Sequence, residues 1–279
     1  MIINKNNILF TQNKKPILYD VYYNPVKTPQ PVVIFCHGYK GFKDWGAWHL
    51  VAEAFANAGF CFVKFNFSHN GGTMENPIDF PDLEAFAENN FSLELDDLDR
   101  ILNEIDMGNE NLPTQISTIS LIGHSRGGGI VLIKAEENRR INKVATWASV
   151  SDFKARFQES TPEFKSWEKK GITHVENSRT KQLLPHKFQF YRDFKENQER
   201  LTIKRAVKNI EIPLLIVHGS DDPTVSVNEA KTMHSWNVNS ELKVIDKADH
   251  VFGAKHPWDE KSLPHLLNRV VLKTIEFLK

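Results

Sequence analysis

The sequence predicts an α/β protein in which helices cover both faces of a mainly parallel sheet. Three observations lead to this prediction. First, short apolar runs rich in β-branched residues, such as Pro-Val-Val-Ile-Phe-Cys at 31–36, recur along most of the chain. Second, segments with apolar residues at helical spacing lie between these runs. Third, the runs are apolar without alternation, which indicates strands buried on both faces, as in parallel sheets.

The first part of the chain opens with a predicted hairpin. Two β-like stretches, around Ile8–Thr11 and Ile17–Tyr22, flank the turn-like sequence Gln-Asn-Lys-Lys. The run at 31–36 then predicts the first buried strand. Apolar residues at helical spacing predict a helix over Ala47–Ala58, and a glycine directly after it is placed to cap its end. Phe60–Phe67 is expected to form the next strand.

The middle of the chain continues the same alternation. Residues 68–90 are rich in Asn, Gly, Pro and acidic residues and predict a long loop. From Phe91 to Ile105 an apolar residue recurs every third or fourth position, which predicts a helix with one buried stripe. Three further elements are expected after it: a strand at 116–122, a helix at 127–138 and a strand at 144–150.

Residues 151–209 interrupt this rhythm. The segment is charged, contains many aromatic residues and has no run typical of a buried strand. We expect an insertion over one end of the sheet. Residues 1–150 and 210–279 would then form the core of the protein.

The alternation resumes after this insertion. Pro213–Val217 predicts a strand. Ser226, with Glu229 three residues later, resembles a capping box that opens a helix extending through Trp236. Residues 242–245 predict the last strand, and apolar residues at helical spacing from 263 to 278 predict a closing amphipathic helix.

Composition excludes several classes of partner. The chain of 279 residues carries 35 basic and 35 acidic side chains, so its net charge offers no attraction to nucleic acid or to an anionic membrane. No apolar stretch reaches the roughly 18 residues of a membrane span. Cys36 and Cys61 lie in apolar runs and are expected to be buried thiols. We therefore expect a cytoplasmic protein, as a monomer or homodimer.

The strongest motif is Gly123-His124-Ser125-Arg126-Gly127, which fits G-x-S-x-G between a predicted strand and a predicted helix. That setting is typical of a nucleophile elbow. The serine needs a tight, strained turn so that its hydroxyl projects above the sheet. Glycines on either side remove the Cβ atoms that would clash with the neighbouring strand and helix. Ser125 is therefore the predicted nucleophile.

A serine nucleophile requires a histidine that takes its proton and a carboxylate that orients the histidine. In elbow enzymes they follow the serine in the order acid, histidine. Two aspartates, Asp221 and Asp222, come directly after the strand at 213–217. His250 follows the last strand, and His256 is its only close rival. Adjacent strand ends would bring the acid and the histidine to the same edge of the sheet.

An oxyanion hole needs two backbone N–H groups near the nucleophile. The residue after the serine, Arg126, should supply one. The other should come from the loop that follows the strand at 31–36, where Tyr39 is the expected donor through its amide. The Tyr39 hydroxyl either contributes as well or only packs, and His37 is expected to fix the geometry of this loop.

The sequence contains no metal or nucleotide signature. There is no H-E-x-x-H, no close pair of His and Cys ligands, and no phosphate-binding G-x-x-x-x-G-K-[ST] loop. We therefore expect neither a metal nor a cofactor.

These motifs together resemble the α/β-hydrolase superfamily over nearly the whole chain. Within it, the chain is most similar to bacterial dienelactone-hydrolase-like, serine-aminopeptidase-like and feruloyl-esterase-like acyl hydrolases. The matching segments are His37-Gly38-Tyr39, Gly123–Gly128, His218–Val225 and Ala248–Phe252. In such enzymes H-G-x-x-D-x-x-V carries the acid at its fifth position, so the resemblance implies Asp222 as the acid. It also implies that the insertion at 151–209 is a helical lid, or cap, that shapes the acyl or alcohol pocket.

Three functions are compatible with this pattern. The leading hypothesis is hydrolysis of a small-molecule carboxylic ester through an acyl-enzyme formed on Ser125. The second is amide or peptide hydrolysis, such as removal of an N-terminal residue. The third is a non-catalytic member of the fold that only binds a ligand, although such a protein would not need a nucleophile, an acid and a base together.

Overall fold

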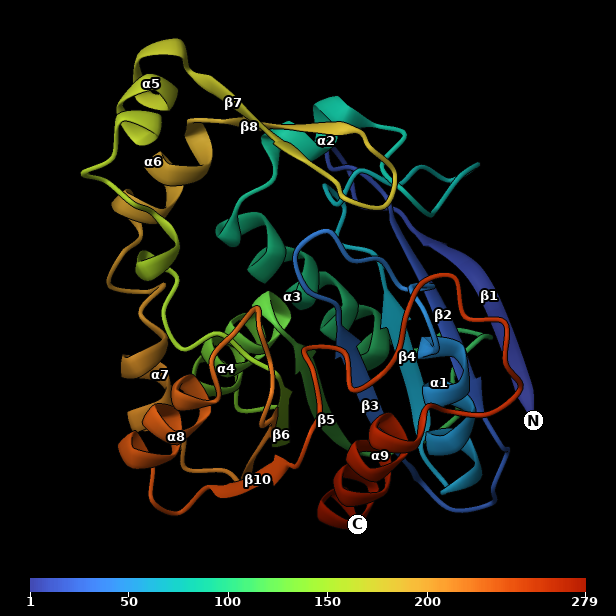
Figure 1. Ribbon diagram of the computed structural model, residues 1–279. Helices are drawn as coiled ribbons and strands as arrows, with labels where there is room; N and C mark the ends of the chain where they lie inside the picture. Colours follow the sequence, from blue (N-terminus) through green and yellow to red (C-terminus); the bar gives the residue numbers. More distant parts are fainter.

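The computed structural model describes residues 1–279 and consists of one eight-stranded sheet between two layers of helices, with further elements above one edge (Figure 1). Across the sheet the strands are ordered β1-β2-β4-β3-β5-β6-β9-β10. Their bounds are β1 Ile2–Leu9, β2 Ile17–Tyr23, β3 Gln30–Cys36, β4 Cys61–Phe65, β5 Ile116–His124, β6 Ile141–Trp147, β9 Leu214–Gly219 and β10 Glu241–Ile245.

The sheet is mainly parallel, as predicted. Only the opening hairpin is antiparallel: β1 pairs with β2, and β2 pairs with β4, in antiparallel fashion, whereas every other neighbouring pair is parallel. Cys36 pairs with Gly123, and His124 pairs with Trp147. The carboxyl ends of β3, β5 and β6 therefore lie side by side at one edge of the sheet, where ligands bind in open α/β sheets.

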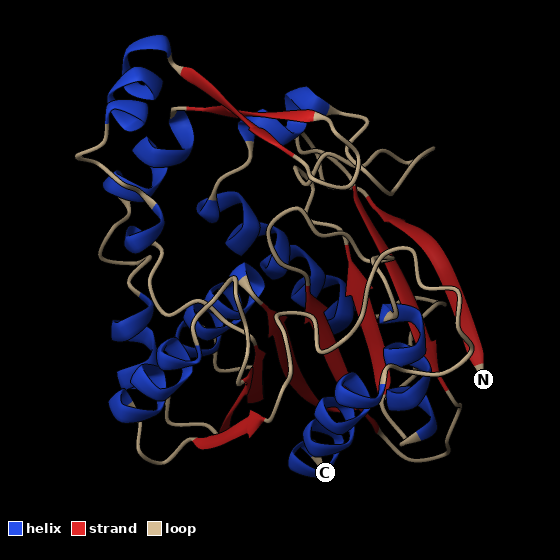
Figure 2. Ribbon diagram, viewed as in Figure 1, coloured by secondary structure: helices blue, strands red, loops and turns tan.

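Two layers of helices cover the two faces (Figure 2). On one face α1 and α9 pack against the sheet, and on the other face lie α3, α4, α7 and α8. Their bounds are α1 Trp48–Asn57, α3 Phe91–Met107, α4 Arg126–Glu137, α7 Ile203–Asn209, α8 Val227–Trp236 and α9 His265–Leu278.

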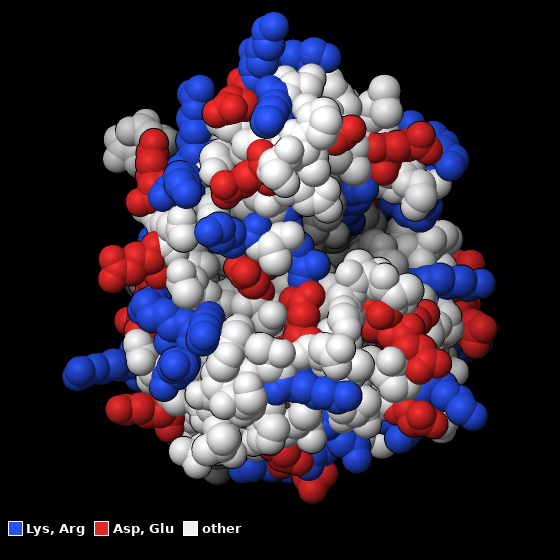
Figure 3. Space-filling view, turned by 60° about the vertical axis from the view of Figure 1, so that its left-hand side comes forward, with Lys and Arg blue, Asp and Glu red and all other residues white.

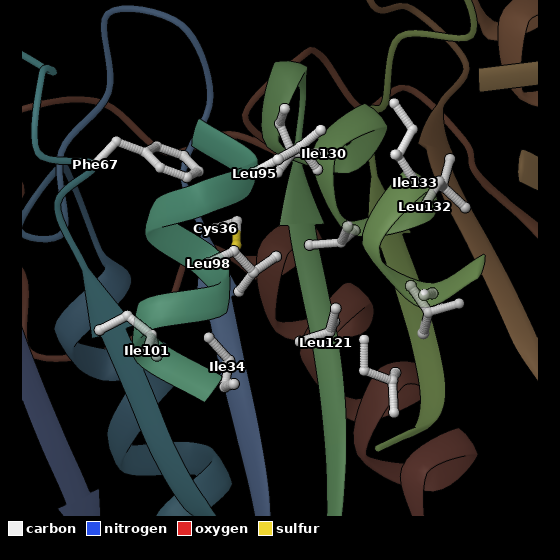
Figure 4. Close-up of a cluster of buried hydrophobic side chains, with 14 of the residues drawn as sticks. Ile34, Cys36, Phe67, Leu95, Leu98, Ile101, Leu121, Ile130, Leu132 and Ile133 are labelled. Atoms are coloured by element: carbon white, nitrogen blue, oxygen red, sulfur yellow. The ribbon is translucent and has the colours of Figure 1, made fainter. Parts of the chain in front are cut away.

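Strand β3, which contains the apolar run at 31–36, shows why the sequence of a central strand is apolar without alternation. Side chains alternate between the two faces of a strand. Val32 and Ile34 accordingly join the core beneath α3 and α4, whereas Val33 and Phe35 join the core beneath α1 and α9. Figure 4 shows the first of these cores, in which strand side chains meet those of α3 and α4. Because both faces are covered, no position of the strand can be polar without a buried partner.

Some element bounds differ from those predicted. Strand β6 begins and ends three residues earlier than the strand predicted at 144–150. Its first half contains the polar residues Asn142 and Lys143, which are not fully buried, so this half lacks the apolar run from which a strand was predicted. β1 likewise starts at Ile2. The predicted loop at 68–90 contains a short helix, α2 (Leu83–Glu88), which Asp82 caps by accepting a hydrogen bond from the Ala85 N–H.

The predicted lid (residues 151–209) contains helices and also a hairpin that was not predicted. Its elements are η1 Lys154–Arg156, α5 Pro162–Lys170, β7 Ile172–Glu176, β8 Leu183–Lys187, α6 Gln189–Glu196 and α7. The strands of the hairpin pair antiparallel in a separate two-stranded sheet above the main one (Figure 1). β7 is almost wholly exposed, so it lacks the apolar alternation that identifies a strand.

The aromatic residues of the lid form a packed cluster that is continuous with the main core. Phe157 contacts Phe190 and Phe194, with ring centroids 5.5 and 5.1 Å apart. The cluster reaches Phe91 at the start of α3, whose ring stacks on Phe153 at 4.0 Å. α7 packs on α4 through buried apolar residues. The division of the chain at residue 209 remains a prediction.

The structure also bears on the cysteines, on membrane-spanning helices and on the distribution of surface charge. Cys36 and Cys61 are buried free thiols, as expected, and burial raises the pKa of both. None of the helices is long and apolar enough to cross a membrane. Basic and acidic side chains are mixed over the face that Figure 3 presents, without a large area of one sign.

An ion-pair network lies buried at the antiparallel side of the sheet. Lys64 on β4 stands opposite Asp20 on β2, and their Nζ and Oδ2 atoms are 2.6 Å apart. Lys43 reaches the other oxygen of Asp20 at 2.8 Å, and both lysines also contact Asp44 at 2.6 Å. Asp20 and Lys64 are wholly buried. Two positive and two negative charges therefore balance, and of the four side chains only that of Asp44 is partly exposed.

Replacing Asp20 by asparagine is expected to lower the free energy of unfolding by about 3–5 kcal/mol, because two buried ammonium groups would share one carboxylate. Urea unfolding measures this change. The matched control is Asp96→Asn, which removes an exposed partner of Lys14 and should cost no more than about 1 kcal/mol. Equal losses in the two variants would contradict the argument.

Candidate active site

The elbow around Ser125 has the strained turn that its sequence predicts. β5 ends at His124 and α4 begins at Arg126, so a single residue connects strand to helix. Ser125 has φ 56° and ψ −119°, a conformation that costs energy for a residue with a Cβ atom. Its N–H donates to the carbonyl of Trp147 on β6 at 2.9 Å, which holds the turn on the edge of the sheet.

The flanking glycines are required by close approach of backbone. A Cβ atom on Gly123 would lie 2.3 Å from the carbonyl oxygen of Gly127. A Cβ atom on Gly127 would lie 2.4 Å from the carbonyl oxygen of Cys36 on β3. Both distances are far shorter than van der Waals contact, so the prediction that these glycines admit the neighbouring strand and helix holds in the structure.

Three predicted site residues come together at this edge. His250 Nε2 is 3.0 Å from the Ser125 Oγ, and His250 Nδ1 is 2.7 Å from Asp222 Oδ2. Of the two candidate aspartates, Asp221 instead points to an exposed turn, where it accepts a hydrogen bond from Ser220. The rival histidine, His256, accepts the N–H of Gly46 through Nδ1 and contacts neither Ser125 nor Asp222.

Asp222 is held as a carboxylate by its surroundings. Burial alone would raise its pKa, but hydrogen bonds involving His218, His250 and the Val225 N–H outweigh burial and hold the pKa well below its usual range. Its Oδ1 accepts the N–H groups of Thr224 and Val225 at 2.8 and 2.9 Å. Its Oδ2 is thereby directed at the ring of His250.

His124, inside the pentapeptide, is a positioning residue that the sequence reasoning missed. Its Nε2 donates to the backbone carbonyl of His250 at 2.9 Å, and the two rings lie 4.9 Å apart. Burial, with the nearby His250, lowers the pKa of His124 to about 3, so the ring is neutral near pH 7. The only sequence signal for this role is that His124 directly precedes Ser125. That position does not reveal a contact with His250, which lies 126 residues later in the chain.

The two expected oxyanion donors have N–H groups free to bind a ligand. The N–H of Tyr39 donates no hydrogen bond within the chain, and that of Arg126 is the first of α4, where no intrahelical carbonyl is available. The Tyr39 hydroxyl instead lies 2.6 Å from Nε2 of His186 on β8. His37 supports the loop as expected: it accepts the Phe67 N–H and its Nδ1 lies 2.9 Å from the Gly38 carbonyl oxygen.

Two cavities meet at Ser125 and Tyr39. The apolar cavity, of about 360 Å³, extends under the lid and is lined mainly by aromatic and apolar side chains, among them Phe91, Phe153, Phe157, Trp167 and Phe190. The polar cavity, of about 290 Å³, opens on the other side of the serine. Its lining includes Lys40, Arg179, His250 and His256. In Figure 3 a recess opens on the molecular surface, with basic side chains along its upper edge.

The charge of Arg126 is compensated inside the apolar cavity. Its guanidinium lies 4.4 Å from the ring centroid of Tyr39 and 5.1 Å from that of Phe190. Its Nη1 is 3.2 Å from the buried carboxylate of Glu94. Burial raises the pKa of Glu94, while the neighbouring Arg126 opposes this rise. The guanidinium thus covers aromatic faces that would otherwise be open to a ligand.

No metal centre is associated with this edge of the sheet. The structure contains no group of three or more His, Cys, Asp or Glu side chains arranged to hold an ion. What the arrangement offers is a hydroxyl, an imidazole, a carboxylate and two free N–H groups around one point. These are the components of acyl transfer by a serine.

Comparison with known proteins identifies the family of this fold. A model of the alpha/beta hydrolase fold matches residues 31–171, just over half of the chain. The chain belongs to the α/β-hydrolase family. The predicted resemblance is therefore confirmed at the level of family and fold. No protein with a curated description matches the sequence of this α/β hydrolase.

Solved structures share the fold along nearly the whole α/β hydrolase chain. Est1E from Butyrivibrio proteoclasticus has a TM-score of 0.73 at 15% identity, over 99% of this chain and 98% of its own. The same protein solved with ferulic acid has a TM-score of 0.69 at 17% identity, over 98% and 97%. Dienelactone hydrolase from Anabaena variabilis has a TM-score of 0.61 at 16% identity, over 98% and 95%.

Proposed function

We propose that this α/β hydrolase is a serine esterase that cleaves small carboxylic esters with an apolar, ring-sized acyl group. The observation that carries the proposal is the continuous hydrogen-bond chain from Asp222 through His250 to Ser125, beside an apolar cavity. Both contacts are within hydrogen-bond distance, so His250 can take the Ser125 proton while Asp222 orients the imidazole ring.

In the first half of the reaction, Ser125 Oγ attacks the ester carbonyl carbon and its proton passes to His250 Nε2. The new carbon–oxygen bond gives a tetrahedral intermediate. When this collapses, the bond to the alcohol oxygen breaks and His250 returns the proton to that oxygen. Ser125 then carries the acyl group.

In the second half, water attacks the acyl carbon and gives its proton to His250. The bond between Ser125 and the acyl carbon breaks, the serine recovers its proton, and the carboxylic acid leaves. Asp222 stays ionised throughout and stabilises the imidazolium each time it forms. The free N–H groups of Tyr39 and Arg126 would hold the negative oxygen of both intermediates.

The apolar cavity favours an acyl group that includes a ring. Its volume of about 360 Å³ is more than twice that of the ~150 Å³ cavity that accommodates benzene in another protein. The ferulic acid found in Est1E is an aromatic acid of this kind. Because the likeness to Est1E is one of fold, the acyl preference rests on the lining of the cavity in this chain.

Removal of an N-terminal residue fits the site less well. Such a reaction needs a group that binds a free ammonium, and no Asp or Glu lines either cavity. Aromatic faces can bind ammonium, but Arg126 already lies over Tyr39, Phe91 and Phe190. A non-catalytic binding protein would have no use for the assembled triad.

A fluorophosphonate probe and a panel of p-nitrophenyl esters test the proposal. The probe is expected to label Ser125, as mass spectrometry of the digested protein would show. Among the esters, kcat/KM should be higher for a 3-phenylpropanoate than for an acetate, because only the former fills the apolar cavity. Failure of the probe to label Ser125, together with no ester hydrolysis, would reject the proposal.

A further inference from the structure

The polar cavity has an unbalanced positive charge. Lys40 and Arg179 line it, and no acidic side chain does. Arg179 is paired with Asp79 outside the lining. Lys40 has no carboxylate within ion-pair distance; its Nζ donates to the backbone carbonyl of Glu176 at 3.0 Å and lies over the Tyr39 ring at 5.3 Å. Lys40 thus contributes one uncompensated charge.

Partial burial makes this charge costly without a partner. Lys40 belongs to the loop after β3 and is half-buried beside the β7–β8 hairpin, and burial lowers its pKa. The other ionisable groups of the lining include His37 and His124, which burial keeps neutral near pH 7. An anion that entered the polar cavity would therefore meet Lys40 without competing with a carboxylate of the protein.

The position of His250 shows which part of the substrate enters the polar cavity. His250 must return its proton to the alcohol oxygen, so this oxygen has to lie within hydrogen-bond reach of Nε2. His250 lines the polar cavity and is absent from the lining of the apolar cavity. The alcohol therefore belongs in the polar cavity and the acyl group in the apolar cavity.

We propose that the physiological ester has an alcohol part that carries a carboxylate, and that Lys40 binds this carboxylate in the polar cavity. The inference rests on the proposed esterase function and extends it to the leaving group. The single uncompensated charge of Lys40 matches the single negative charge of one carboxylate. A cavity of about 290 Å³ has room for a single substituted ring, by comparison with the ~150 Å³ that benzene requires.

A matched pair of esters tests the proposal. The cinnamoyl ester of 3-hydroxybenzoate carries the anion on the alcohol side, and the cinnamoyl ester of 3-hydroxybenzamide is its neutral counterpart of similar shape. The wild-type protein is expected to favour the carboxylate ester in kcat/KM by about tenfold, the size of a partly shielded ion pair. Because the pair is exposed to solvent ions, the preference should shrink as salt is added.

Variants of Lys40 assign the preference to this residue. In Lys40→Met the ratio of the two kcat/KM values should fall to about one, and in Lys40→Glu it should invert. Lys27→Met is the matched control, since Lys27 is exposed in the loop between β2 and β3, at the opposite end of the sheet. This variant should keep the wild-type ratio.

A third ester checks the assignment of the cavities. The phenyl ester of 4-carboxycinnamic acid carries its anion on the acyl side and should be hydrolysed no faster than phenyl cinnamate. The proposal is overturned if the wild-type protein hydrolyses the matched esters equally well, if the preference survives in Lys40→Met, or if the acyl-side anion is the one favoured. Absence of any ester hydrolysis would instead reject the esterase function itself.

Discussion

Replacing Ser125 by alanine is expected to lower kcat for ester hydrolysis by about 10⁶-fold, the order of loss found when a triad serine is removed from another hydrolase. The variant retains the Tyr39 and Arg126 N–H groups and both cavities, so binding persists, but no atom is left to form the acyl-enzyme. Steady-state kinetics with a 3-phenylpropanoate ester measures the change, and fluorophosphonate labelling should disappear.

The Ser125→Ala variant should fold normally. In the native structure the Ser125 hydroxyl contacts His250, and the backbone of the turn is held by its own N–H bond to Trp147. We therefore expect a midpoint of urea unfolding close to that of the wild-type protein. Ser235→Ala, an exposed position on α8, is the control for activity. A Ser125→Ala protein with more than a tenth of the wild-type kcat would contradict the assignment of the nucleophile.

The elbow could be predicted from sequence because the residues that form it are close together along the chain. A strand, a strained residue and a helix follow one another within a few positions, and each glycine is required by backbone that approaches it closely. Gly123 meets Gly127 four residues later, and Gly127 meets Cys36 of the adjacent strand. Because this close packing accompanies the strand–turn–helix arrangement itself, the glycine pattern between a predicted strand and a predicted helix identifies the turn.

The choice between Asp221 and Asp222 could not be made from the residues without the resemblance. Both follow β9, and one residue changes the direction of the side chain. In the structure the N–H groups of Thr224 and Val225 bind Asp222, while Asp221 turns toward Ser220. These contacts depend on the path of the loop between β9 and α8, and no periodicity in the sequence records that path.

Long-range contacts between polar residues were equally out of reach. Lys64 lies in the middle of an apolar strand sequence, and only the register of β2 against β4 brings Asp20 opposite it. The hairpin of the lid is similar in kind: β7 is exposed, so its pairing with β8 leaves no alternation of apolar residues. Periodic apolar residues in a sequence indicate which positions are buried among other apolar side chains. A buried ion pair and an exposed hairpin leave no such periodicity, so neither could be predicted.

The hydrogen bonds around Asp222 make its replacement by asparagine an informative change. Two N–H donors face Oδ1 of Asp222, so the amide oxygen of an asparagine would occupy that position. The amide NH₂ group would then face His250 Nδ1, which must accept a hydrogen bond. His250 would carry its proton on Nε2, the atom next to Ser125 Oγ, and could not take the serine proton.

We therefore expect Asp222→Asn to lower kcat by about 10⁴-fold, as the same change does in another serine hydrolase with this triad. The matched control, Asp221→Asn, alters an exposed turn and should leave kcat within about twofold, as expected for a surface change outside the site. Steady-state kinetics on both proteins gives the comparison. Similar losses in the two variants, or an Asp222→Asn protein with a tenth of the wild-type kcat, would show that His250 does not depend on the carboxylate of Asp222 for its tautomer. The Ser125–His250 contact would then act as a dyad.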